Sequence, residues 1–264
     1  MPEASSSKFI LTKELDAYFI SLYKAFSFVI QIFKNLFIPP FHLKEIINQC
    51  YEIGYKSLSL ISLTGFIIGI VFTKQSRPPL EDLGATSWLP SLMGIAIVKA
   101  LGPLVTALIC AGKIGSGIGA ELGSMKVTEQ IDAMEVSAIN PFKYLVVTRV
   151  TAALITIPIL SFYCTVVALF GSFTNVYSNE STNFFAYIYS AFSNVGFLDF
   201  FTAVTKAIFY GFTIGAIGCY KGFNASQGTR GVGIAANEAV VISIFVIFIE
   251  EILIVQVSNW IRYF

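Results

Sequence analysis

The sequence is poor in charged side chains. Only 12% of its 264 residues are Asp, Glu, Lys or Arg, against roughly 25% in a typical soluble domain. Hydrophobic residues make up 55% and the mean hydropathy is +0.74. This composition excludes an ordinary soluble domain and indicates a polytopic membrane protein. The net charge of +1 gives no general attraction to nucleic acid, so none is expected as a partner.

Cysteine and histidine are also scarce. The four cysteines form no CxxC pair, and three of them fall in apolar segments, as small buried hydrophobic residues do. The single histidine has no cysteine or second histidine near it. We therefore expect no metal site and no Ser/His/Asp catalytic set. These residues are Cys50, Cys110, Cys164, Cys219 and His42.

Nucleotide-binding motifs are missing. A P-loop needs GxxxxGK followed by Ser or Thr, whereas Gly112-Lys113 is followed by Ile114. The glycines between 115 and 119 resemble part of a dinucleotide fingerprint, but they follow no strand. The chain is therefore not expected to be an enzyme. If it moves a substrate uphill, the energy must come from a partner or from an ion gradient.

Five apolar segments are each close to the ~20 residues needed to cross hydrocarbon. They predict an all-α membrane protein with five transmembrane helices, at about 54–73, 88–110, 142–173, 198–220 and 234–260. Gly102-Pro103 predicts a kink inside the second span. Polar residues 74–87 are expected to form a loop, and the aromatic stretch 171–193 a loop at the membrane interface.

An amphipathic helix is predicted before the first span. Apolar residues recur every three or four positions from Leu15 to Phe37, which is a helical period. With lysines on the opposite face, this helix suits the membrane interface; the alternative is a helix packed on another subunit. We divide the chain into an N-terminal interfacial region, 1–53, and a five-span domain, 54–264. No cleavable signal peptide is apparent.

The basic residues predict the orientation. Most of the 17 Lys and Arg residues share one side of the membrane if the N-terminus is cytoplasmic, and the positive side is normally inside. With five spans the C-terminus is then outside. The stretch 111–141 lies in the cytoplasm.

This cytoplasmic stretch has two halves. In the first, small residues fall four apart, so that another backbone can approach one helix face; they are Ala111, Gly115, Gly119 and Gly123. The second half reads as a short amphipathic helix that ends at Asn140-Pro141. Its apolar stripe is Val127, Ile131, Met134 and Ala138. A polar helix held between spans suits docking to a cytoplasmic protein.

The same stretch resembles a known family. The residues Gly-Lys-Ile-Gly-Ser, Ala-Glu-Leu-Gly-Ser-Met-Lys-Val-Thr-Glu-Gln-Ile-Asp-Ala-Met, Asn-Pro and Tyr-Leu-Val-Val, between 112 and 147, are followed by Arg149. They are similar to the MlaE family, which comprises permease subunits of lipid-transporting ABC systems. The resemblance covers roughly Ile53 to Val257.

The resemblance implies a function and a set of partners. It implies a homodimer that sits between two cytoplasmic ABC ATPase subunits and a periplasmic MCE-domain lipid-binding protein. The dimer would move phospholipid between the inner membrane and that MCE-domain carrier. ATP and Mg would bind the partner ATPase, with no cofactor on this chain. The implied location is the inner membrane of a double-membraned bacterium, with the plastid inner envelope as the alternative.

The resemblance also places a short coupling helix between spans two and three, in the loop matching 121–140. This helix would fit a groove on the ATPase. The residues assigned to ATPase coupling are Glu121, Lys126, Thr128, Glu129, Gln130, Asp132 and Glu135.

Charges inside the spans are costly if unpaired, by several kcal/mol each at the bilayer centre. Two interpretations stay open for them. In the first, Lys99 and Lys206 line a cavity for an anionic lipid headgroup. In the second, they have a structural role: they pair with Glu250 and Glu251, or their ammonium groups reach the membrane surface. The residues assigned to a lipid pathway are Lys99, Gly102, Pro103, Lys206 and Glu250. Lys206 matches a basic residue of the family, whereas the family's acidic residue in the second span is Ala100 here.

Two other functions compete. An ion-gradient-driven secondary transporter of an amphipathic substrate would use Lys99, Glu250 and Glu251 as a relay. Five spans without a visible inverted repeat argue against it. A membrane enzyme acting on lipids would need paired catalytic groups on one membrane face, and the sequence offers none. Co-purification with an ATPase would support the ABC permease over these two alternatives.

Overall fold

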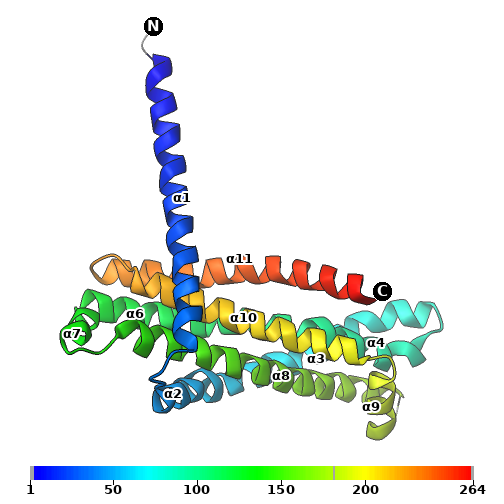
Figure 1. The fold of residues 1–264 in the computed structure, drawn as a ribbon. Helices are drawn as coiled ribbons and strands as arrows, with labels where there is room; N and C mark the ends of the chain where they lie inside the picture. The colour runs from blue at the N-terminus through cyan, green and yellow to red at the C-terminus, as the bar shows by residue number, and fades with distance from the viewer. Residues whose placement is uncertain (1–2, 181, 263–264) are drawn as a thin grey trace. The chain divides into compact units, whose positions relative to one another are not determined.

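The computed structural model describes residues 3–180 and 182–262 (Figure 1). These residues are helical wherever they are regular, and no strand occurs among them. The chain divides into two compact units, residues 1–41 and 42–264. This division falls before α2, whereas the boundary predicted from the sequence, between 53 and 54, falls near the end of α2. The predicted division into an interfacial region, 1–53, and a five-span domain, 54–264, stays a prediction.

The N-terminal unit contains one long helix, α1, Glu3–Leu36. The sequence predicted a helix here from the apolar stripe between Leu15 and Phe37, and the helix that is present spans Glu3–Leu36. The side chain of Leu15, the first residue of the predicted stripe, lies outside the described residues. The interfacial position of α1 stays a prediction.

The second unit is a helical bundle. Its regular elements are α2 (Leu43–Gly54), η1 (Tyr55–Ser57), α3 (Leu58–Asp82), η2 (Thr86–Trp88), α4 (Leu89–Ala96), η3 (Ile97–Leu101), α5 (Gly102–Cys110), η4 (Ala111–Gly115), α6 (Ser116–Val127), α7 (Gln130–Val136), η5 (Phe142–Val147), α8 (Thr148–Glu180), α9 (Phe184–Phe192), α10 (Phe197–Phe223) and α11 (Thr229–Arg262).

Five helical segments among the described residues are long and apolar enough to cross a membrane. They are Leu43–Asp82, Thr86–Val127, Phe142–Glu180, Phe197–Phe223 and Thr229–Arg262. The predicted all-α class and the five spans are therefore confirmed. In Figure 1 the long helices run side by side, with α2 and α7 at one end of the bundle and α9 at the other. We call these the α7 end and the α9 end.

Two predicted loops are instead extensions of spans. Residues 74–82 continue α3, and residues 171–180 continue α8. Polar contacts between the two extensions explain the difference: the Thr73 hydroxyl donates to Ser172 Oγ at 2.7 Å, and Arg77 pairs with Glu180 at 3.3 Å. Each extension thus provides the partner for polar groups of the other, so the helices stay ordered beyond their apolar parts.

The rest of the second predicted loop contains α9. The Asn183 side chain accepts a hydrogen bond from the Phe185 N–H at the start of this helix, a usual N-cap contact. The buried Tyr187 hydroxyl donates to Ser172 Oγ at 2.7 Å. Burial raises the pKa of Tyr187 to about 12, so the phenol stays protonated and remains a donor near neutral pH. This contact fixes α9 to the end of α8.

Three short segments of spans two and three are π-helical: η3, η4 and η5. A π turn is rare and is frequently found at functional sites. η3 ends directly before Gly102-Pro103, where the sequence predicted a kink. The regular hydrogen-bond ladder is therefore interrupted at the predicted position, and the interruption takes the form of a wider helical turn.

Small residues allow the helices to approach closely, and one of them, Gly119, belongs to the predicted set of small residues between 111 and 123. A side chain on Gly69 of α3 would collide with the carbonyl oxygen of Ala168 in α8. A Cβ on Gly119 of α6 would lie 3.2 Å from the carbonyl oxygen of Ala235 in α11. Gly119, one of the small residues between 111 and 123, thus allows α6 to pack closely against α11.

Replacing Gly69 with Ala should destabilise the bundle. The added methyl group has no room against a backbone carbonyl, so α3 and α8 must separate. Overpacking of this kind typically costs about 1–3 kcal/mol. We expect a lower midpoint of thermal unfolding for the purified chain in detergent. Gly112→Ala is the matched control, because its Cβ would meet nothing within 4 Å; equal midpoints for the two variants would contradict the packing argument.

Candidate functional site

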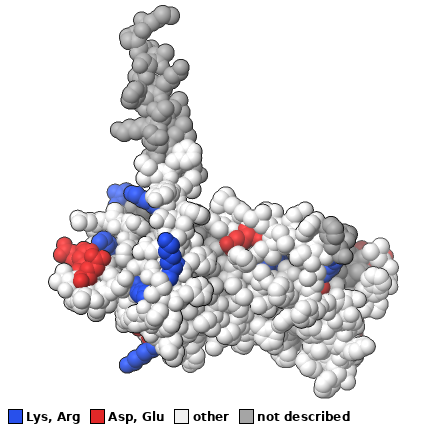
Figure 2. Space-filling view, in the orientation of Figure 1, with Lys and Arg blue, Asp and Glu red and all other residues white. Residues whose placement is uncertain are grey.

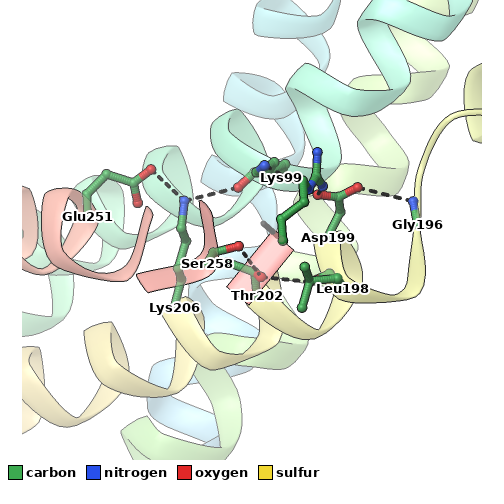
Figure 3. A network of polar contacts seen from close by, with 9 residues as sticks. Lys99, Gly196, Leu198, Asp199, Thr202, Lys206, Glu251 and Ser258 are labelled. Atoms are coloured by element: carbon green, nitrogen blue, oxygen red, sulfur yellow. Dashed lines mark hydrogen bonds and ion pairs between the residues drawn. The ribbon is translucent and has the colours of Figure 1, made fainter. Parts of the chain in front are cut away.

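A network of charged side chains lies inside the bundle, towards the α9 end (Figure 3). Its centre is Lys206 of α10, which is fully buried. The Lys206 ammonium lies 2.6 Å from Glu251 Oε1 of α11 and donates to the carbonyl oxygen of Lys99 at 3.3 Å. The Tyr210 hydroxyl donates to the other oxygen of Glu251. Both oxygens of this carboxylate therefore have a donor.

A second carboxylate, that of Asp199, belongs to the same network. Its Oδ1 pairs with the Lys99 ammonium at 3.3 Å and with the Arg262 guanidinium. Its Oδ2 accepts the Gly196 N–H at 3.1 Å. Asp199 thus satisfies the N–H of the N-cap residue of α10, Gly196, and is also the ion-pair partner of residues in spans two and five (Figure 3).

Glu250 lies next to this network but is not part of it. The Thr213 hydroxyl donates to Glu250 Oε1. Glu250 Oε2 is buried, and no described residue hydrogen-bonds to it. A buried carboxylate oxygen without a partner is unusual and calls for an explanation, such as a bound group or a second chain.

The structure contains one of the two arrangements that the sequence left open for the charges. Lys206 pairs with Glu251, as the structural interpretation expected. Lys99 pairs with Asp199, whereas the sequence offered Glu250 or Glu251 as its partner. That assignment was wrong for Lys99 because Asp199 was taken as part of the apolar fourth span. A lipid-binding role for Lys99, Lys206 and Glu250 stays a prediction.

Gly102 and Pro103 lie elsewhere, where α5 packs on α8. A side chain on Gly102 would collide with the Thr165 hydroxyl. Pro103 lines a small apolar pocket of about 90 Å³ together with Pro158, Phe162 and Ala203. Of the residues predicted for a lipid pathway, Lys99 and Lys206 therefore belong to the charge network, and Glu250 lies beside it. Gly102 and Pro103 lie apart from them, where α5 packs on α8. A lipid role for this group also stays a prediction.

The loop between spans two and three contains the short helix α7, Gln130–Val136, which a tight turn separates from α6. The single amphipathic helix expected from the stripe Val127 to Ala138 is instead broken after α6. The N–H groups of Thr128 and Glu129 donate to the carbonyls of Ser124 and Lys126. Glu129 then has a left-handed backbone, with φ 59°. This turn reverses the chain before α7, and the buried side chain of Ile131 holds α7 in place.

The turn and α7 expose a group of acidic and polar side chains, which Figure 2 shows as an acidic surface at this end of the bundle. Asp132 pairs with Lys126 across the turn at 2.9 Å. Glu121 does not join this group, because its carboxylate pairs with the buried Arg149 of α8 at 2.7 Å. We call the exposed group the α7 surface; it consists of Thr128, Glu129, Gln130, Asp132 and Glu135.

Comparison with known proteins supports a single family. Residues 46–257 match the family model described as Permease MlaE. The chain belongs to the MlaE permease family. It is 34% identical over 237 residues to a probable ABC transporter permease protein of Rickettsia typhi, covering 90% of this chain and 91% of that protein. Similar proteins from Synechocystis and Pyropia yezoensis are also named probable ABC transporter permease proteins. The Synechocystis protein is 31% identical, covering 90% of each chain; the Pyropia protein is 35% identical, covering 86% of this chain and 88% of that one.

The chain is thus an ABC transporter permease of the MlaE family and a multi-pass membrane protein. Sequence reasoning missed three residues of its charge network: Asp199, Tyr210 and Arg262. A signal for Asp199 was present, since it follows Gly196 by three residues, which is the spacing of a carboxylate that caps a helix start. Tyr210 and Arg262 have no such local signal. Their partners lie 41 and 63 residues away.

Proposed function

We propose that this MlaE permease is the transmembrane subunit of an ATP-driven phospholipid transporter. In this proposal it moves lipid between the inner membrane and a periplasmic MCE-domain carrier. The observation that carries the proposal is the α7 surface. It is a short, exposed helix held at a turn between two spans, in a chain of ABC permease lineage. The chain itself carries no nucleotide motif, so the proposed site of ATP and Mg is the partner ATPase.

The proposed orientation places the α7 end in the cytoplasm and the α9 end in the periplasm. The excess of Lys and Arg on the α7 side supports it. Span two and α6 form one continuous helical segment, Thr86–Val127, that ends at the α7 turn. A force applied to α7 by the ATPase would therefore act directly on the span that contains Lys99.

The proposed assembly contains two copies of the chain. Only 11% of the most apolar stretch of α11 is buried within one chain. Large apolar side chains of α11, including Phe245 and Ile252, are 65% and 69% exposed. Glu250 on the same helix has the unpartnered oxygen. A second chain against α11, with a phospholipid route between the copies, would account for both features.

The proposal is tested by reconstitution. The permease would be co-expressed with its ATPase and MCE-domain partners, placed in vesicles with a labelled phospholipid, and transfer of the label would be measured with and without ATP. We expect transfer only with ATP, and none when the ATPase carries an inactive P-loop. Transfer by the permease alone, driven by an ion gradient, would instead support the secondary transporter.

A further inference from the structure

A polar pocket of about 210 Å³ lies at the α7 end, between α2 and the start of α6. It does not involve the charge network or the α7 surface. One wall comes from α2 and η1, and the other from η4 and α6. Its polar lining residues are Gln49, Glu52, Lys56, Ser57, Lys113 and Glu121.

We propose that this pocket binds the phosphate diester of a glycerophospholipid from the membrane leaflet at the α7 end. Two polar groups in the pocket, the Ser57 hydroxyl and the Lys113 ammonium, are not fully satisfied: the first has no hydrogen-bond partner and the second has no anionic one among the described residues. The Ser57 side chain is 1% exposed, and no described residue hydrogen-bonds to its Oγ. Lys113 donates only to a carbonyl oxygen, that of Lys56, and no carboxylate of the described residues forms an ion pair with it.

The remaining charges of the pocket are already neutralised. Glu52 pairs with Lys56 at 2.5 Å, and Glu121 pairs with Arg149 at 2.7 Å. The ammonium of Lys113 therefore leaves an excess of one positive charge. A phosphate diester carries one negative charge, and its oxygens accept hydrogen bonds from both an ammonium and a hydroxyl. The pocket thus matches the charge and the donors that this ligand requires.

The position of the pocket favours a lipid over a soluble anion. The outward face of α2 and η1 carries exposed apolar side chains at intervals of four: Leu43, Ile47, Tyr51 and Tyr55. The rings of Tyr51 and Tyr55 are stacked with their centres 5.0 Å apart. Exposed tyrosines beside an apolar span are typical of the headgroup region of a bilayer. The pocket lies on the opposite face of α2 and η1 from these side chains. This position suits a lipid whose phosphate enters the pocket from the headgroup region.

Gly117 gives the pocket its space. It is one of the lining residues, and a Cβ built on it would meet nothing within 4 Å. A leucine at this position would project into the pocket, because its Cβ has open space. This substitution tests the pocket independently of its charges.

The experiment measures lipid bound to the full chain, purified in detergent without ATPase or MCE-domain partners, by native mass spectrometry. Phosphatidylglycerol, diacylglycerol and soluble glycerol phosphate are added separately. We expect the wild-type chain to retain phosphatidylglycerol. Lys113→Met should weaken retention of this lipid by roughly tenfold or more, the loss expected for a charge-assisted hydrogen bond. Gly117→Leu should weaken it by a similar factor because the leucine side chain occupies the space of the phosphate. Lys44→Gln is the matched control, because Lys44 lies on α2 outside the pocket.

Every other result would overturn the proposal. Equal retention of diacylglycerol would show that the phosphate is not recognised. Equally tight binding of glycerol phosphate would indicate a soluble anion site. An equal loss in Lys44→Gln would indicate nonspecific attraction to lysine, and unchanged retention in both pocket variants would show that the pocket is not used. The proposal rests on the proposed function and adds to it a lipid site at the opposite end of the bundle from the charge network. Failure of ATP-driven transfer would leave this binding result unaffected.

Discussion

Replacing Lys206 with Met is expected to give the largest loss of stability among single substitutions in the charge network. Lys206 is fully buried, and its ammonium is the only charged partner of Glu251 among the described residues. Methionine keeps most of the volume but leaves the carboxylate with the Tyr210 hydroxyl alone. Breaking a buried ion pair on one side typically costs about 3–5 kcal/mol. We expect a clear decrease in the midpoint of thermal unfolding of the purified chain.

A double variant separates structure from lipid binding. Lys206→Met combined with Glu251→Leu replaces both charges by apolar groups, which is often close to neutral for stability. We expect it to recover most of the lost thermal stability. If Lys206 also binds a lipid phosphate, lipid recovered with the complex stays low in both variants. Wild-type stability in Lys206→Met would contradict the structural role, and wild-type lipid occupancy in both variants would contradict the lipid role.

Reversing two charges on the α7 surface is expected to abolish association with the ATPase. Glu129 and Asp132 are both exposed on the turn and on α7. The pair of Asp132 with Lys126 is also exposed, so its loss should affect stability little. Glu129→Lys together with Asp132→Lys would place two positive charges where the proposed partner meets negative ones. We expect the permease to fold and to dimerise while the ATPase no longer co-purifies.

Two controls make this result specific. Glu81→Lys reverses an exposed charge at the other end of the bundle, where Glu81 pairs with Arg77, and should retain the ATPase. Glu129→Gly removes the carboxylate but suits the left-handed backbone at this position, so it tests the charge with the turn intact. Normal co-purification of the double reversal would mean that the ATPase docks elsewhere.

The spans were predictable from sequence because hydropathy alone determines them, but their ends were not. Residues 74–82 and 171–180 are polar enough to read as loops. They are helical because Thr73 meets Ser172 and Arg77 meets Glu180 across two spans. Such contacts depend on which helices are neighbours, and a single sequence does not contain that information. The same limit applies to α7, where an uninterrupted apolar stripe concealed the turn at Glu129.

The candidate site was predicted in part for a similar reason. The cost of a charge in a membrane drew attention to Lys99, Lys206, Glu250 and Glu251, and all four have a polar side-chain partner on a neighbouring span. The sequence alone could not decide which carboxylate pairs with each lysine, and it offered both Glu250 and Glu251. Lys206 has the expected type of partner, whereas the partner of Lys99 is Asp199, a residue at a helix start that has a local structural role as well.

The π turns of the second span have a mechanical consequence. η3 and η4 lie on either side of α5, between the end of α4 and the beginning of α6. A π turn holds one residue more than an α turn, and one residue corresponds to about 100° of rotation and 1.5 Å of rise. If η4 tightened to an α turn, α6 and the α7 turn would rotate by about that angle relative to Lys99. A change of either π turn to an α turn would therefore change the rotational register between the two ends of the span.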